Sequence, residues 1–150
     1  MRLLRDSLKI LSLIAAIFLG SGVLALAEQR LALKGYDPVA YFTEKRAMLG
    51  DAQHQYNWDG STYRFASTKH LELFKADPDR YLPQYSNLCA ASVAKGVKVQ
   101  GQPEYWLVHD GRLYLFGGPQ GPALMRGDAS MKSVADKNFS AVSRLPNPPQ

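Results

Sequence analysis

The sequence predicts a small α+β domain that packs two hairpin–helix units together, because one pattern occurs twice at a fixed distance. Residues 59–65 read Asp-Gly-Ser-Thr-Tyr-Arg-Phe and residues 110–116 read Asp-Gly-Arg-Leu-Tyr-Leu-Phe, so Asp, Gly, Tyr and Phe recur with an offset of 51. An Asp-Gly pair between alternating apolar residues is typical of a β-hairpin. Helices that follow antiparallel hairpins predict the α+β class.

The first unit contains the clearer signals. Residues 35–42 are apolar and aromatic, and we expect an extended stretch that docks on the core, because their Asp-Pro pair disfavours helix. Residues 53–66 alternate and form the predicted hairpin. A helix then begins after a cap at Ser67 or Thr68 and ends at the Asp-Pro pair at 77–78.

The second unit follows a short connector. A small helix is predicted over residues 88–95 and ends at Gly96, and the second hairpin turns at 110–111. A shortened helix over 123–126 and a last helix over 130–142 complete the unit. The inward residues of the last helix are predicted to be Met131, Val134, Ala135 and Phe139.

The predicted core is rich in aromatic residues. The two hairpins, the first helix and the short turn after that helix supply its members. They are Tyr63, Phe65, Leu71, Phe74, Tyr81 and Trp106.

The N-terminus has the pattern of a signal peptide over residues 1–27. Three basic residues come first, an apolar run covers 10–26, and Ala-Leu-Ala at 25–27 is a small-residue cleavage signal. An uncleaved membrane anchor is the alternative, since the run approaches the length of a spanning helix. We therefore expect a periplasmic or secreted protein that meets a membrane only if this segment is retained.

The rest of the chain is one small domain with a mildly basic composition. Its lysines and arginines are scattered, whereas a nucleic-acid-binding surface needs a cluster or stripe of them, so no nucleic-acid partner is expected. The one cysteine, Cys89, cannot form an internal disulfide. The Pro-rich end at 146–150 is predicted to be disordered.

Several short motifs in order resemble the exported, single-domain subgroup of the YHS domain family. They are Gly-Tyr-Asp-Pro-Val-Ala-Tyr-Phe at 35–42, Tyr-Arg-Phe-Ala-Ser at 63–67, Phe-Lys-Ala-Asp-Pro-Asp-Arg-Tyr at 74–81, Gln-Tyr at 84–85 and Cys-Ala at 89–90. The later Trp106, Val108, Asp-Gly at 110–111 and Leu-Tyr-Leu at 113–115 fit that subgroup too. The resemblance implies a YHS-like domain over residues 28–145.

The resemblance also implies a relation to metal-binding modules. Metal-binding members carry cysteines at three positions that hold Ala40, Ala66 and His70 in this chain. Two thiolates are therefore absent and imidazole replaces the third ligand. A tight metal site of the family type is not expected.

Cys89 and His70 are the candidate metal ligands, and copper or zinc the candidate ions. Both ions accept thiolate and imidazole ligands, so the two side chains are predicted to lie close enough to share one ion, with His54 or His109 as a third ligand. The alternative is that Cys89 packs as a small apolar residue on an alanine-rich helix and the other histidines lie on the surface.

Eight tyrosines stand in the chain after residue 27. Tyr36, Tyr63 and Tyr85 are the candidates for lining a ligand pocket, where a tyrosine offers an apolar face and a hydroxyl. The alternative is that the tyrosines pack the core and its rim.

The function predicted from the sequence is an exported, non-catalytic binding module that holds copper or zinc weakly or transiently. The alternatives are a metal-free module that binds another periplasmic protein and, third, a thiol-dependent enzyme using Cys89 with His70. The sequence contains no phosphate-binding loop, nucleophile elbow or haem-attachment motif, so neither a nucleotide nor haem is expected as cofactor.

Overall fold

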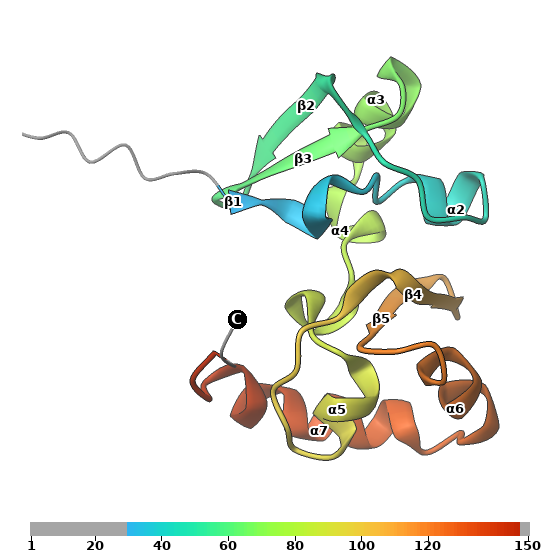
Figure 1. The fold of residues 1–150 in the computed structure, drawn as a ribbon, viewed down its shortest axis with the longest axis vertical. Coiled ribbons are helices and arrows are strands. Elements are labelled where there is room, and N and C mark those ends of the chain that lie inside the picture. Colours follow the sequence, from blue (N-terminus) through green and yellow to red (C-terminus); the bar gives the residue numbers. More distant parts are fainter. Residues whose placement is uncertain (1–29, 148–150) are drawn as a thin grey trace, which may run out of the picture.

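The computed structural model describes residues 30–147, which form a small α+β domain as predicted. In Figure 1 the N-terminal half lies above the C-terminal half, and α4 lies between them. The predicted signal peptide over 1–27 and the last three residues of the predicted tail lie outside the described residues. Within those residues no helix is long and apolar enough to cross a membrane.

The N-terminal half is built on a three-stranded sheet of order β1-β3-β2, in which β1 is parallel and β2 antiparallel to β3. We call this half, residues 30–81, the first unit. Its elements are β1 (Arg30–Leu31), the 3₁₀ turn η1 (Ala32–Gly35), α2 (Ala40–Thr43), β2 (Asp51–Trp58), β3 (Ser61–Phe65), α3 (Thr68–Ala76) and α4 (Pro78–Tyr81).

The C-terminal half is built on a two-stranded antiparallel sheet, β4-β5, with helices around it. We call this half, residues 84–143, the second unit. Its elements are η2 (Gln84–Asn87), α5 (Ala90–Ala94), β4 (Gln102–His109), β5 (Arg112–Phe116), α6 (Gly121–Gly127) and α7 (Met131–Ser143).

The two hairpins have the same register, which confirms the hairpins predicted from the repeated pattern. Tyr56 pairs with Tyr63 in the first, and Leu107 pairs with Tyr114 in the second, each 51 residues further on. Both turns have positive φ at Asp and Gly, as a two-residue hairpin loop requires. Each hairpin also carries an irregularity at the start of its first strand.

The structural repeat begins earlier than the sequence pattern does. Residues 33–35 and residues 85–87 both form left-handed turns, with φ between 51° and 85°. The last residue of each turn forms a backbone hydrogen bond with the residue just before the hairpin. Gly50 N–H donates to Gly35 O, and Gly101 N–H donates to Asn87 O, both at 2.8 Å. The two units therefore share a left-handed turn, a short helix and a hairpin followed by a helix.

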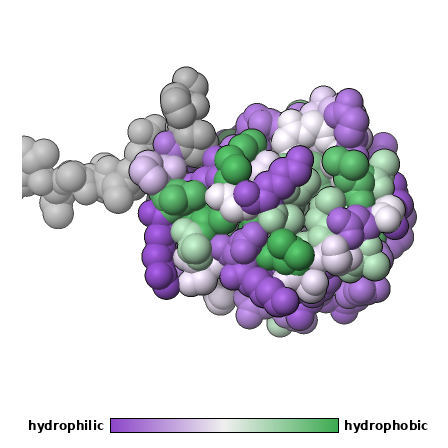
Figure 2. All heavy atoms as spheres, turned by 90° about the horizontal axis from the view of Figure 1, so that it is seen from below, coloured by the Kyte–Doolittle hydropathy of each residue, from purple (hydrophilic) through white to green (hydrophobic). Residues whose placement is uncertain are grey.

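Three hydrophobic clusters hold the domain together. One belongs to the first unit and surrounds Phe74, and a second belongs to the second unit and surrounds Tyr114. The third joins the units, because Leu33 and Tyr41 of the first pack with Leu113 and Leu115 of the second. The lower face of the molecule shows hydrophobic side chains in separate patches between hydrophilic ones (Figure 2).

The aromatic core prediction is confirmed for four of its six residues. Tyr63, Phe65, Phe74 and Tyr81 are buried, whereas Leu71 and Trp106 are partly buried and pack against the clusters from outside. In α7, Val134 is not inward as predicted but 37% exposed, and Val142 is buried instead. Val142 follows Ala135 by two helical turns, so the two side chains lie on the same side of α7. Val134 precedes Ala135 by one residue and therefore points to a different side of the helix.

The prediction of an extended stretch over residues 35–42 is wrong at both of its ends. Gly35 closes η1, and Ala40 begins α2. The Asp-Pro pair does not prevent a helix here, because both of its residues lie before the helix begins. Asp37 Oδ1 accepts the N–H groups of Val39 and Ala40, at 2.8 and 3.3 Å. An aspartate in that role favours a helical turn directly after it.

Candidate functional site

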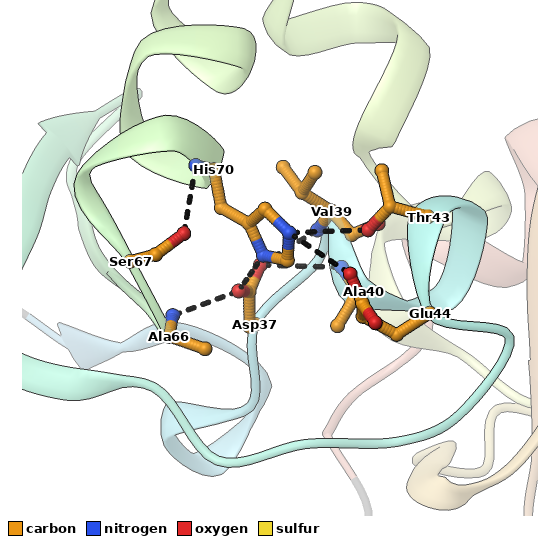
Figure 3. Close-up of polar contacts among 8 residues, drawn as sticks. All are labelled: Asp37, Val39, Ala40, Thr43, Glu44, Ala66, Ser67 and His70. Carbon is orange, nitrogen blue, oxygen red and sulfur yellow. Dashed lines mark hydrogen bonds and ion pairs between the residues drawn. The ribbon is translucent and has the colours of Figure 1, made fainter.

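The candidate site is centred on Asp37, which the sequence analysis did not select. Its carboxylate is completely buried and accepts four hydrogen bonds (Figure 3). Oδ1 accepts the N–H groups of Val39 and Ala40, and Oδ2 accepts the Ala66 N–H at 2.8 Å and lies 2.6 Å from His70 Nδ1. The carboxylate thus ties three chain segments together: the loop before α2, the residue after β3 and the first turn of α3.

The position of His70 follows from the cap of α3. Ser67 Oγ accepts the His70 N–H at 3.2 Å, as the predicted cap requires, and this places the imidazole on the first turn, where it is 5% exposed. With Nδ1 protonated, the ring donates to Asp37, and Nε2 faces the Thr43 hydroxyl at 3.2 Å. Glu44 Oε1 lies 3.6 Å from the same nitrogen.

The two ring nitrogens of His70 have different surroundings. The buried carboxylate orients the ring, and Nε2 faces Thr43 and the partly exposed Glu44. Chemically, the ring can exchange a proton or share a ligand only through Nε2. The Thr43 hydroxyl also donates to Val39 O at 3.2 Å, so its one proton cannot serve both acceptors at once.

Cys89 lies in the second unit, at the residue before α5. The thiol is free and buried, and it belongs to the cluster that contains Leu88, Ala90 and Val93. A methyl group built on Gly117 would lie 3.8 Å from its sulfur, which is ordinary packing distance. Cys89 is therefore placed as a small apolar residue.

The described contacts do not join Cys89 to His70. His70 contacts Asp37, Thr43 and Glu44 of its own unit, whereas Cys89 packs in the cluster of the other unit. Among residues 30–147 no group of three or more His, Cys, Asp and Glu side chains is placed to hold a metal ion.

The other two histidines lie on the two hairpins. His54 is half-buried on β2. His109 ends β4, and its Nε2 lies 3.4 Å from the exposed carboxylate of Asp110. Neither is among the residues around His70.

The three candidate pocket tyrosines are used in packing and in hydrogen bonds inside the domain. Tyr63 and Tyr85 are buried, and burial raises the pKa of both hydroxyls. Tyr85 also donates to Asp136 Oδ1 at 2.8 Å. The Tyr36 hydroxyl donates to Glu104 at 2.9 Å, and that hydrogen bond raises its pKa.

Comparison with known proteins finds similarity to one family over part of the chain. Residues 39–85 match the model of the YHS domain family. This match covers most of the first unit together with the start of η2, and the second unit continues beyond it. No curated protein and no solved structure matches the chain.

A thiolate metal centre does not fit the residues present. Ala40, at the first of the three cysteine positions, is completely buried, and Ala66 at the second carries no donor in its side chain. In the remaining polar pair, the Asp37 carboxylate accepts four hydrogen bonds within the fold, and one of them comes from His70 Nδ1. A tight copper or zinc site usually takes three or four protein ligands, which this region does not provide.

Proposed function

We propose that the protein is an exported, non-catalytic binding module of the YHS type that works without a resident metal ion. Export to the periplasm or out of the cell is supported by the basic, apolar and Ala-Leu-Ala segments of the N-terminus. The YHS assignment is supported by the match over residues 39–85.

The observation that carries this proposal is the internal use of the reactive side chains. Asp37 accepts four hydrogen bonds, both ring nitrogens of His70 face oxygen atoms of the first unit, and the Cys89 thiol is buried in the second. A reactive or metal-binding thiolate needs access to its partner, and the thiol of Cys89 is buried. The metal-free binding role is therefore favoured over thiol catalysis.

A chelation experiment tests the proposal. The protein, expressed from the full sequence and purified in the form the cell releases, is treated with a strong chelator, and its metal content and melting temperature are measured before and after. We expect no stoichiometric copper or zinc and no change in Tm. Cys89 should react with a thiol reagent only after denaturation, and Cys89→Ser should abolish that signal. Stoichiometric metal whose removal lowers Tm, or rapid reaction of the native thiol, would overturn the proposal.

A weak metal site at His70 is the second candidate, and one observation favours it. Metal-ligating histidines usually donate their other ring nitrogen to a carboxylate, as His70 does to Asp37, and Nε2 here faces Glu44. Zinc or copper(II) accepts imidazole and carboxylate ligands.

Three single variants separate the metal hypotheses in a competition titration with zinc or copper. A site at Nε2 predicts that His70→Ala and Glu44→Gln each lower affinity about tenfold and that Cys89→Ser does not. The pair predicted from the sequence requires a similar loss in Cys89→Ser and His70→Ala. No loss in any variant would exclude both.

A further inference from the structure

A groove of about 820 Å³ lies between the two units, away from the residues around His70. From the first unit, β1 and η1 line it. From the second, the walls are the end of η2, the segment over 98–103 and the end of α7. Its size is within the usual range for a site that binds a small molecule.

The charged residues that line the groove all have the same sign. They are Arg30, Lys34 and Lys98, and no aspartate or glutamate is among the lining residues. Glu104, next to this lining, is bonded to the Tyr36 hydroxyl. The groove therefore has a positive potential, although the domain as a whole is only mildly basic.

The two lysines are held in place by neutral oxygens. Lys34 Nζ donates to the Gln102 side chain, and Lys98 Nζ donates to the carbonyl groups of Ser143 and Leu145, at 2.9 and 2.7 Å. Within the described part of the chain, neither they nor Arg30 forms an ion pair with a carboxylate. Their charges are thus positioned by the fold and remain available to an anion.

The rest of the lining is largely apolar or uncharged. Leu31 is 38% exposed on one wall, whereas the apolar residues that line the other wall, Leu88, Pro103 and Leu115, are largely buried beneath its surface. A ligand that suits this lining has a negatively charged head and an apolar body.

Both left-handed turns contribute residues to this groove. Leu33 and Lys34 come from the first turn, and Ser86 and Asn87 come from the second, all with φ between 51° and 68°. Non-glycine residues held in this sparsely populated conformation concentrate at ligand-binding segments. The repeat therefore brings two such turns to one groove.

We propose that this groove binds a small organic anion that carries one carboxylate or phosphate head on a short apolar body. This inference rests on the proposed function, since it names the ligand class of the binding module. The charged head is recognised by Lys34, Lys98 and Arg30, and the apolar body lies against Leu31 and the opposite wall.

Titration by NMR and calorimetry tests the proposal with three probes of similar length: octanoate, octyl phosphate and octanol, each below its micelle concentration. We expect both anions to bind, octanol to bind at least tenfold more weakly, and amide shifts to centre on Leu31, Ser86 and Gly101. Preference for only one anion identifies the head group. Binding should weaken as salt is added, because the attraction is between charges at an open groove.

Charge-neutralising variants locate the site. Lys34→Gln should weaken anion binding about tenfold, as expected for the loss of one charge-assisted hydrogen bond. Lys137→Gln, an exposed position on α7 outside the groove, is the matched control and should leave affinity unchanged. Lys98→Gln is a second variant, with its fold checked by circular dichroism.

Several outcomes would overturn this inference while leaving the proposed function intact. These are no binding of either anion, equal binding of octanol, shifts elsewhere on the domain, or equal losses in Lys34→Gln and Lys137→Gln. The proposed function fails separately, through the chelation and thiol measurements, which do not involve these probes.

Discussion

Removing the carboxylate of Asp37 should destabilise the domain more than any other single change in the first unit's polar contacts. Asp37→Ala leaves four donors without their acceptor: the N–H groups of Val39, Ala40 and Ala66, and the ring of His70. Breaking a buried, hydrogen-bonded charged group costs about 3–5 kcal/mol, and each buried donor left unpaired accounts for about 1–3 kcal/mol. A small domain has a total stability of only about 5–15 kcal/mol.

Asp37→Asn should lower the free energy of unfolding by less than Asp37→Ala, because asparagine keeps one of the two side-chain oxygens. The amide oxygen can still accept the N–H groups of Val39 and Ala40. The amide NH₂ then faces His70, which can move its proton to Nε2 and accept at Nδ1, while Ala66 N–H loses its acceptor. We expect a loss of about 1–3 kcal/mol.

Urea denaturation followed by tryptophan fluorescence and circular dichroism measures both losses. Asp79→Asn, at an exposed position on α4, is the matched control and should lie within about 0.5 kcal/mol of the parent protein. Nitrogen NMR of the His70 ring should show a proton on Nδ1 in the parent and on Nε2 in Asp37→Asn. A cost below about 1 kcal/mol for Asp37→Ala, or an unchanged tautomer in Asp37→Asn, would refute this reasoning.

Three further changes test the packing and its pH dependence. Phe74→Ala removes a completely buried ring that packs against two other rings at 4.9 and 5.1 Å, and should lower the free energy of unfolding by about 3–5 kcal/mol; a loss below 1 kcal/mol would contradict its core position. Burial and the bond to Asp136 raise the pKa of Tyr85, so it keeps its proton in the folded state where unfolded tyrosine ionises, and stability should fall as pH rises above about 10. In a series of denaturation measurements at alkaline pH, the stability of Tyr85→Phe should fall less steeply with pH than that of the parent protein. An identical slope would argue against Tyr85 as the cause of the fall. Gly121→Ala would place a methyl group 2.4 Å from a phenylalanine side chain and should cost about 1–3 kcal/mol, whereas Gly127→Ala meets nothing within 4 Å and serves as its control.

The hairpins were predictable because their signals are local. The Asp-Gly turns at 59–60 and 110–111 and the alternation around them determine turn type and register together. The cap of α3 at Ser67 was predictable for the same reason, since a hydroxyl directly before an apolar, periodic segment satisfies a free N–H group.

The left-handed turns were not predictable over their whole length, because only the last residue of each, Gly35 or Asn87, favours positive φ. Leu33 and Lys34 have no special preference for that conformation, and the backbone bond from Gly50 to Gly35, across the unit, fixes it instead. The equivalent hydrogen bond in the second unit, from Gly101 to Asn87, shows that the left-handed turn is a repeated feature of this fold. Tertiary contacts override local preference at such positions.

For the candidate site, the sequence indicated His70 but not its partner Asp37. His70 was singled out by its chemistry and position, but Asp37 was interpreted only as the residue before a proline. The two are 33 residues apart, and no periodicity relates them. The signal that could have found Asp37 is a short acidic side chain directly before a proline and an apolar run, which is the composition of a helix start.

The structural repeat explains why position 89 holds a small apolar residue and not a carboxylate. Asp37 and Cys89 occupy equivalent backbone positions, since their N–H groups donate at 2.8 Å to Met48 O and Val99 O, each in the segment just before the first strand of its unit's hairpin. In the first unit the side chain at this position is a carboxylate, and His70 donates to it. The equivalent of His70 in the second unit is Gly121, and Phe116 lies so close to it that even a methyl group does not fit. A buried carboxylate at position 89 would lack the imidazole partner and would carry a large desolvation cost, whereas a small thiol packs there without one. The buried carboxylate–imidazole pair of this fold therefore belongs to the first unit, and Cys89 fills the equivalent position in the second unit as a core residue.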